Sequence, residues 1–209
     1  MVRQVAMRRD TPLRIAATLP IRSLHDGKRR LAPLLSAERR QQIIVELCRT
    51  VVDALRESGV VDMIALVSRD DATLAFGETL GLAPIWEERP GLNEALQTAG
   101  DWAREAGAEA QMIVLPDLPL LRPDDLRAVV YALPGEEGIV ACPDRTGTGT
   151  NLLLMRPCRI IAPGFGTGSF ERHLQAAHGA DVAVATVDVP GTRWDVDTPD
   201  DLAGLSIRI

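Results

Sequence analysis

Residues 111–119 read Gln-Met-Ile-Val-Leu-Pro-Asp-Leu-Pro, and this stretch decides the fold. Its first five residues are almost continuously apolar, which is typical of a strand in a parallel sheet that is covered on both faces. Two prolines then stiffen the loop around Asp117, directly after the predicted strand. Ligands of such sheets gather at the carboxyl ends of the parallel strands, so Asp117 is a candidate site residue. The alternative interpretation is a polar turn residue, or one that helps to cap the helix that opens at Pro123.

The chain before this strand repeats one rhythm, a short apolar run followed by a longer segment with helical spacing. Strands are expected over residues 14–19, 63–67 and 83–86, and helices over 36–58, 70–80 and 92–106. Ser36 is a suitable N-cap for the first helix, and Gly59 stands where a helix-ending glycine belongs. This alternation indicates right-handed βαβ units and a mainly parallel sheet.

The rhythm changes after Gly138. Residues 139–142 and 151–155 are predicted strands joined by the sequence DRTGTGT, a pattern that favours an antiparallel pair. A helix over 169–178, a strand over 182–187 and a short helix capped by Thr198 follow. The sequence therefore predicts an α/β fold, a three-layer open sandwich whose mainly parallel sheet has an antiparallel excursion. Residues 13–209 are interpreted as a single domain, and residues 1–12 as an N-terminal extension that need not be ordered.

Composition narrows the class of protein. The 209 residues are 46% hydrophobic and 25% charged, ordinary values for a globular protein. No apolar run approaches the ~18–20 residues that span a bilayer. A net charge of −6 and only 3% aromatic residues argue against a nucleic-acid partner. The three cysteines lie far apart, without zinc or disulfide spacing, so we expect a cytoplasmic protein with no membrane partner.

A second acidic motif is Asp195-Val196-Asp197. In an extended segment residues i and i+2 face the same side, so the two carboxylates would repel each other unless a cation lay between them. Oxygen ligands without a nearby Cys or His favour Mg²⁺. The alternative is a helix start with Thr198 at N-cap and Pro199 at N1, which leaves Asp195 unexplained.

Three further segments could bind anions. The glycine-rich sequence GFGTGS, residues 164–169, directly precedes a predicted helix, although it is neither a Walker A loop nor a Rossmann fingerprint. Residues 146–151 offer hydroxyls, glycines and an amide, or else form a simple hairpin turn. The basic residues Arg22 and Lys28-Arg29-Arg30 follow the first strand, where they could neutralise a triphosphate or form a solvated loop. His173 and His178 are interpreted as helix-surface residues.

Together these motifs resemble the 2-phospho-L-lactate guanylyltransferase family of coenzyme F-420 biosynthesis, which includes enzymes for phosphoenolpyruvate and 3-phospho-D-glycerate. The similar segments, in the family's order, are GKRRLAPLLSAERR, GLNEAL, PDLPLL, DRTGTGTNLLL, FGTGSFERHL and DVDTPDDL. The resemblance implies a GT-A-like nucleotidyltransferase fold. It also implies transfer of GMP from GTP to the phosphate of a three-carbon phospho-acid, with release of pyrophosphate.

The resemblance also implies roles for particular residues. The implied Mg²⁺ ligands are Asp117, Asp195 and Asp197, which with Lys28 make up the catalytic set. The implied contacts to the co-substrate GTP are Pro20, Arg22, Lys28, Leu92, Asn93 and Pro116. The implied acceptor-binding residues are Thr150, Asn151, Gly166, Gly168 and Ser169. Arg22 stands where the family often has a lysine. The positive charge is kept, but a planar guanidinium and a compact ammonium do not bind phosphate oxygens in the same way.

Other interpretations remain open at this stage. The acceptor could be any of the three phospho-acids, and a homodimer is the default expectation for a small enzyme. A nucleotidyltransferase for molybdopterin or a sugar phosphate is one alternative function. A nucleotide-binding module without turnover is the other.

Overall fold

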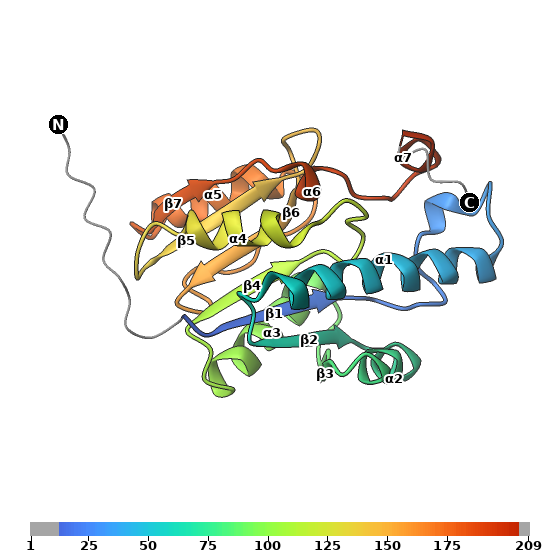
Figure 1. Cartoon of the computed structure of the whole chain (residues 1–209), viewed down its shortest axis with the longest axis horizontal. Coiled ribbons are helices and arrows are strands. Elements are labelled where there is room, and N and C mark those ends of the chain that lie inside the picture. The colour runs from blue at the N-terminus through green and yellow to red at the C-terminus, as the bar shows by residue number, and fades with distance from the viewer. Residues whose placement is uncertain (1–12, 205–209) are drawn as a thin grey trace.

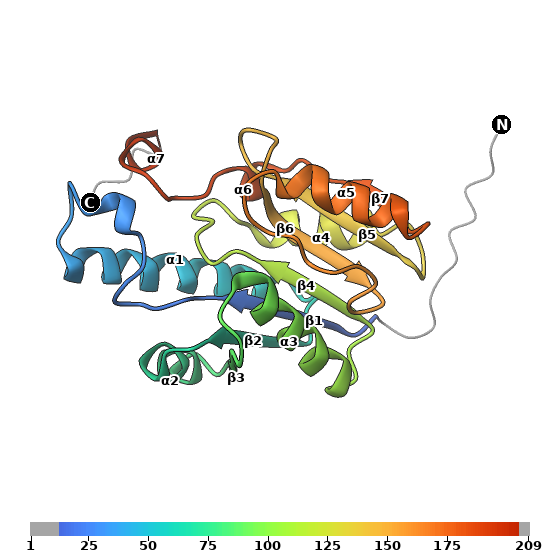
Figure 2. The ribbon, with the colours of Figure 1, turned by 180° about the vertical axis from the view of Figure 1, so that it is seen from behind.

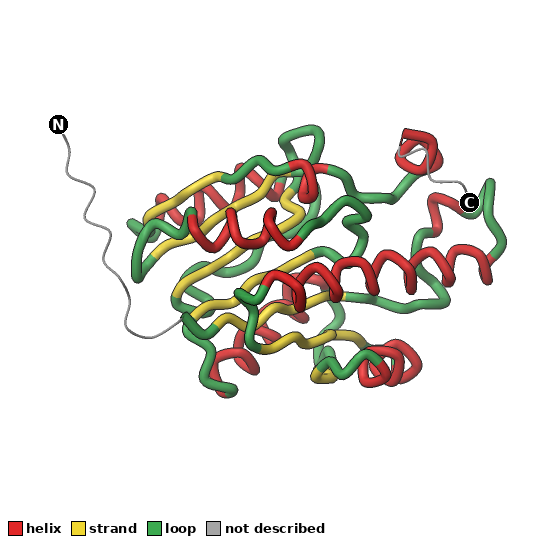
Figure 3. Tube along the Cα trace, in the orientation of Figure 1, coloured by secondary structure: helices red, strands yellow, loops and turns green. Residues whose placement is uncertain are grey.

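The computed structural model describes residues 13–204, and a seven-stranded sheet forms its centre (Figures 1 and 3). The strands are β1 (Ile15–Pro20), β2 (Met63–Ser68), β3 (Ala83–Trp86), β4 (Ala110–Val114), β5 (Gly138–Pro143), β6 (Thr150–Arg156) and β7 (Ala183–Thr186). Their spatial order is β3-β2-β1-β4-β6-β5-β7. The predicted N-terminal extension over 1–12 lies outside the described residues.

Strand β6 alone runs against the other six. It pairs antiparallel with β4 and with β5, whereas the pairs β1–β2, β1–β4, β2–β3 and β5–β7 are parallel. The predicted mainly parallel sheet with an antiparallel excursion is therefore confirmed. The reversal has a consequence for the site, because it brings the first residues of β6 to the edge where the parallel strands end.

Helices cover both faces of the sheet, which makes the predicted three layers. They are α1 (Ala37–Ser58), α2 (Asp71–Thr79), α3 (Leu92–Glu105), α4 (Pro123–Tyr131), α5 (Ser169–Gly179), α6 (Pro190–Arg193) and α7 (Pro199–Gly204), with a 3-10 turn η1 (Arg29–Leu31). Helices α1 and α4 lie on the face seen in Figure 1, and α3 and α5 on the face seen in Figure 2. The turn η1 and helix α6 were not expected from the sequence. No helix among residues 13–204 is long and apolar enough to cross a bilayer.

The side chains of β4 explain why this strand is almost continuously apolar. Met112 and Val114 pack in the cluster that includes residues of α1 and α4, whereas Ile113 packs with Leu96 of α3 and Ala177 of α5. All three side chains are fully buried. A strand that buries both faces lacks the usual alternation of apolar and polar residues. Its polar residue, Gln111, is buried as well, and its amide donates to Thr18 Oγ1 and to the Leu96 carbonyl.

The C-terminal segment crosses over to the beginning of α1. Val196 and Leu202 pack against Leu31 of η1 and against Ile43 and Leu47 of α1. Because Val196 is buried here, its two neighbours in the extended chain face the opposite way, toward the carboxyl edge of the sheet. This packing carries Asp195 and Asp197 to residues that lie far away in the sequence.

Candidate active site

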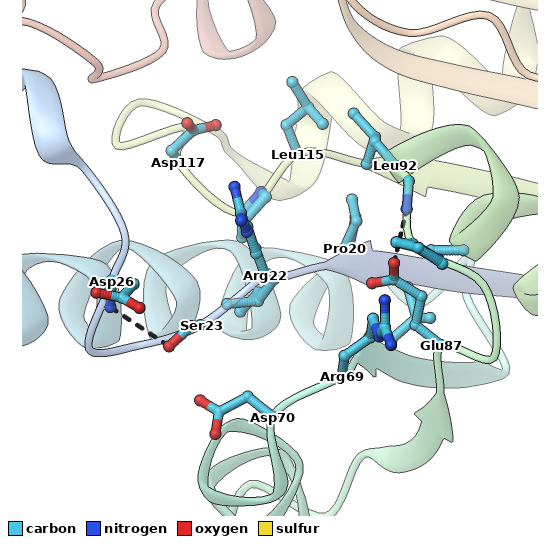
Figure 4. A pocket seen from close by; sticks show the side chains of 16 residues that line it. Pro20, Arg22, Ser23, Asp26, Arg69, Asp70, Glu87, Leu92, Leu115 and Asp117 are labelled. Carbon is cyan, nitrogen blue, oxygen red and sulfur yellow. Dashed lines mark hydrogen bonds between the residues drawn. The ribbon is translucent and has the colours of Figure 1, made fainter.

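A pocket of about 960 Å³ lies at the carboxyl ends of β1, β2, β3 and β4 (Figure 4). Five residues expected at the site line it: Pro20, Arg22, Leu92, Pro116 and Asp117. The chain leaves β1 toward β2 on one side, while β4 flanks β1 on the other, so the pocket occupies a topological switch point. The structure thus brings together residues from three loops where the sheet geometry predicts a ligand.

Other charged residues of this pocket were missed by sequence reasoning, Arg69 and Glu87 among them. In Figure 4 these two side chains lie at the opposite end of the pocket from Asp117. Glu87 follows β3 and is only 8% exposed, and its Oε1 accepts a 2.8 Å hydrogen bond from the Gly91 N–H. Glu87 could have been found in the same way as Asp117, because each is a charged residue that lies just after a predicted strand.

A second pocket, of about 480 Å³, is lined by four cationic side chains: Arg22, Lys28, Arg29 and Arg30. Asp197 also lines it. Arg22 belongs to both pockets, so the cationic pocket adjoins the larger one. The basic loop after the first strand therefore gathers its charge at the site, which favours the binding of a polyanion there.

The Lys28 ammonium lies between two of the predicted metal-binding carboxylates. Its Nζ donates a hydrogen bond to Asp117 Oδ2 and another, of 2.7 Å, to Asp197 Oδ1. Lys28 adopts a left-handed backbone conformation, with φ 53°, at the start of η1. Burial disfavours the charged ammonium, but the two carboxylates outweigh burial and raise the pKa of Lys28 above its ordinary value.

Asp195 completes this group of charges. Its Oδ1 accepts a hydrogen bond of 3.3 Å from the Asn151 amide, and the Val196 N–H donates to the Asp117 carbonyl at 3.2 Å. Burial and the nearby Asp117 carboxylate raise the pKa of Asp195, and Asp197 adds to the effect. The three acids are therefore close enough to repel one another, as the motif DVD and the loop after β4 predict.

The helix start after this motif is present as well. The Asp201 carboxylate accepts hydrogen bonds from the Asp197 and Thr198 backbone N–H groups, at 3.0 and 2.7 Å. The helix-start interpretation is therefore confirmed, while cation binding by Asp195 and Asp197 stays a prediction. The hydrogen bonds of Thr198 and Asp201 fix the beginning of α7. They also fix the backbone of Asp197, whose side chain contacts Lys28.

The oxygen atoms of these three carboxylates are chemically suited to bind a divalent cation. Within residues 13–204 no three Asp, Glu, His or Cys side chains are already gathered around one point where a metal ion would sit, and Lys28 pairs with two of the acids instead. Asp117 Oδ1, however, is buried without any hydrogen-bond partner. A buried carboxylate oxygen left unpaired beside two further carboxylates suits a hard cation such as Mg²⁺.

The predicted acceptor residues meet around the start of α5. The Thr150 N–H donates to Ser169 Oγ at 2.8 Å, and Thr150 Oγ1 lies 2.9 Å from His173 Nδ1. Gly166 and Gly168 have φ values of 114° and 71°, which glycine adopts without strain. Gly168 is the N-cap of α5, and Ser169 is the first residue of the helix. Neither pocket lining includes this group.

The interpretation of His173 as a surface residue was also wrong. His173 is 1% exposed, and its Nε2 accepts a 2.9 Å hydrogen bond from the Gly164 N–H. Burial, together with the charge of Arg172, lowers its pKa to about 4. His178, on the same helix, is exposed.

Asn93 links this group to the larger pocket. Its amide Nδ2 donates to the Phe165 carbonyl at 3.2 Å, and its Oδ1 accepts from the Phe165 N–H at 2.7 Å. The side chain of Asn93 is thus used to hold the glycine-rich loop, whereas its neighbour Leu92 lines the pocket. The contact of Asn93 with a nucleoside that the family resemblance implies stays a prediction.

Of residues 146–151, the first four lie in the turn that joins the antiparallel strands β5 and β6, as their alternative interpretation predicts, and anion binding by the segment stays a prediction. The turn after β5 is organised by Asp144, whose Oδ1 accepts hydrogen bonds from the Thr146 and Thr148 N–H groups. Burial raises the pKa of the Cys48 and Cys142 thiols to about 12, so neither thiol is a ready nucleophile.

Comparison with solved structures defines the class of the fold. A putative nucleotide-diphospho-sugar transferase from Desulfovibrio desulfuricans G20 superposes with a TM-score of 0.76 at 15% identity, over 92% of this chain and 86% of the other. Glucosyl-3-phosphoglycerate synthase from Mycobacterium tuberculosis, solved with Mg²⁺ and uridine-diphosphate, gives a TM-score of 0.62 at 17% identity, over 92% and 74%. The fold is that of the nucleotide-diphospho-sugar transferases and nucleotidyltransferases.

The family follows from the sequence comparison. The chain belongs to the guanylyl transferase CofC like family, whose family model matches residues 15–208. A phosphoenolpyruvate guanylyltransferase from Sphaerobacter thermophilus is 38% identical, over 91% of this chain and 91% of that protein. A 2-phospho-L-lactate guanylyltransferase from Methanobrevibacter ruminantium is 28% identical, over 93% and 86%.

Proposed function

We propose that this protein transfers the guanylyl group of GTP to the phosphate of a three-carbon phospho-acid, with release of pyrophosphate, as a step of coenzyme F-420 biosynthesis in the cytoplasm. The observation that carries the proposal is the position of Lys28. Its ammonium holds two carboxylates at the junction between a large pocket and a cationic one. Family membership and the names of the relatives support guanylyl transfer.

The two pockets match the two parts of a nucleoside triphosphate. The larger pocket, lined by Pro20, Leu92 and Pro116, would take the nucleoside. The Glu87 carboxylate in that pocket accepts a hydrogen bond from the Gly91 N–H, and an ionised carboxylate can also accept from the N–H groups of guanine. The cationic pocket, with Arg22 and Lys28, would take the phosphates.

The residues that would hold Mg²⁺ are Asp117, Asp195 and Asp197. When bound, the cation would neutralise negative charge on the phosphate oxygens of both substrates. The solved structure of the same fold that contains Mg²⁺ and a nucleotide supports this role for a divalent cation. Lys28, which pairs with two of these acids here, lines the cationic pocket together with Arg22 and would face the phosphates of GTP.

The protein has to position the phosphate of the acceptor, but it does not have to activate this phosphate as a nucleophile. A phosphate monoester is mostly dianionic at neutral pH, because its second pKa lies near ~6, so the nucleophile needs no base. The chain supplies donors instead: the Thr150 and Ser169 hydroxyls lie beside the glycine-rich loop. Holding two anions in line against their mutual repulsion is then the main contribution of the protein.

A competition among three acids tests this proposal. The protein is incubated with GTP, Mg²⁺ and equal amounts of phosphoenolpyruvate, 2-phospho-L-lactate and 3-phospho-D-glycerate, and the product is identified by its mass. We expect the guanylyl adduct of phosphoenolpyruvate, since the 38% identical relative carries that name. An adduct of one of the other two acids would correct the acceptor only, and pyrophosphate release without any of the three adducts would contradict the proposed function.

A nucleotide panel separates guanylyl transfer from the alternative nucleotidyltransferases. With the preferred acid, GTP is expected to support pyrophosphate release far better than ATP, CTP or UTP. Equal use of CTP would contradict the guanine assignment. The homodimer expected from the sequence remains a prediction, which sedimentation of the purified chain would check.

A further inference from the structure

His173 has a protonation state that its neighbours determine. Its Nε2 accepts the hydrogen bond from the Gly164 N–H, so this nitrogen carries no proton. The ring is neutral near pH 7, because burial lowers its pKa to about 4. The one ring proton is therefore on Nδ1, and Nδ1–H donates to Thr150 Oγ1 at 2.9 Å.

This direction of the hydrogen bond leaves a donor unused on Thr150. The Thr150 oxygen accepts from His173, and the hydroxyl proton finds no acceptor among residues 13–204. Ser169 is in the same state, because its Oγ accepts from the Thr150 N–H and its proton has no acceptor in the described chain. The two side chains are 2% and 1% exposed, so unused donors at this depth are unusual.

We propose that His173 is a positioning residue for the acceptor: by donating to Thr150 Oγ1 it orients the Thr150 hydroxyl as a donor toward an anionic oxygen of the phospho-acid. The inference rests on the proposed function and adds a residue to it. If the ring had the opposite tautomer, Thr150 would donate to His173 and would offer the acceptor only its lone pairs. The edge of the Phe165 ring, 4.9 Å from the imidazole between centroids, holds the ring in place.

Two substitutions separate the two hydrogen bonds of the ring. His173→Gln places an amide oxygen where Nε2 accepts from Gly164, but it removes the donor to Thr150. His173→Asn places an amide nitrogen near Nδ1 and keeps that donor, but it loses the contact with Gly164. His178→Gln, at an exposed position of the same helix, is the matched control.

Kinetics on both substrates give the first readout. We expect His173→Gln to raise KM for the acceptor about tenfold, as the loss of one hydrogen bond does, with kcat and KM for GTP changed less than about twofold. His173→Asn should lie closer to the wild type. In a Thr150→Val background His173→Gln should add little, because the hydroxyl it orients is gone. Equal changes in both KM values, or a full tenfold addition in the Thr150→Val background, would overturn the inference.

A second readout does not depend on turnover. Long-range ¹H–¹⁵N spectra of the histidine rings in the ligand-free protein should show that Nδ1 of His173 is protonated and that Nε2 is not. The opposite tautomer would overturn the inference. If the wild type forms no guanylyl product, the proposed function fails. Calorimetric binding of phosphoenolpyruvate then decides the inference separately: tighter binding to the wild type than to His173→Gln supports it, and equal or absent binding overturns it.

Discussion

At the scale of single residues, the ammonium of Lys28 partly neutralises the negative charge of the three aspartates in the site. It pairs with Asp117 and Asp197, whose side chains are 14% and 44% exposed, while Asp195 accepts a hydrogen bond from the Asn151 amide. The raised pKa of Asp195 shows that its negative charge is unfavourable in the folded chain without a further cation. Function and stability are therefore opposed at this position.

Asp195→Asn tests that opposition. Removing the charge while keeping an oxygen for the Asn151 amide should raise the free energy of unfolding by roughly 1 kcal/mol in EDTA, and it should abolish pyrophosphate release. Denaturant unfolding in EDTA and a pyrophosphate assay in Mg²⁺ measure the two effects. A variant that is less stable than the wild type and fully active would show that Asp195 is a structural residue.

The buried His173 predicts how stability depends on pH. Its pKa of about 4 in the folded chain lies below the ordinary value of 6.5, so the unfolded chain binds more protons between these values. The stability that the neutral ring gives is complete above pH 6.5 and is lost as the pH falls toward 4. Between pH 7 and pH 5 the wild type should lose about 2 kcal/mol more than His173→Gln, as measured by urea unfolding. Parallel pH profiles would contradict the burial of this ring.

At the scale of elements, the strands and long helices could be predicted because each has its own local signal. The helix α1 begins after Ser36 and ends at Gly59, as expected from the two capping residues. The turn η1 could not be predicted, since three residues are too few for periodicity and Lys28 takes a left-handed conformation there. His173 was misread because its partners, Gly164 and Thr150, are 9 and 23 residues away.

Some residues of the candidate site could be predicted from local sequence signals, and others could not. Asp117 was found because it lies just after a strong strand. The acidic motif after β7 was found because a helix start explains the residues from Thr198 onward but leaves Asp195 unexplained. Glu87 was missed, since the run Glu87-Glu88-Arg89 looks like a solvated loop until β3 is placed beside β2. The sequence motif predicts where charge gathers, but the pairing of one side chain with another depends on tertiary packing.

Asn93 provides a test at this scale, because it joins α3 to the glycine-rich loop. Asn93→Ala removes both hydrogen bonds to Phe165, so we expect KM for the acceptor to rise roughly tenfold while KM for GTP changes little. Asn93→Asp keeps an oxygen for the Phe165 N–H and should have a smaller effect. The reverse pattern, a higher KM for GTP alone, would contradict this expectation and support the contact with the nucleoside that the family resemblance implies.

At the scale of the whole molecule, the site depends on both ends of the described chain. The Lys28–Asp197 contact joins residues 169 positions apart, and it forms because Val196 and Leu202 pack against η1 and α1. The reversed strand β6 adds Thr150 and Asn151 to the same edge, where the Leu115 N–H donates to the Asn151 carbonyl. The sheet thus brings carboxylates, cations and hydroxyls from segments far apart in the sequence to the same edge.

Pyrophosphate release by Asp117→Asn, compared with the wild type over a range of Mg²⁺ concentrations, tests this arrangement most directly. The matched control is Asp124→Asn, since Asp124 is 90% exposed on α4 and pairs only with Arg127 among the described residues. The carboxylate at 117 should be essential, so its amide variant should lose about a hundredfold or more of the rate at every Mg²⁺ concentration while Asp124→Asn keeps the wild-type rate. A folded Asp117→Asn protein with the wild-type rate and Mg²⁺ dependence would contradict the account.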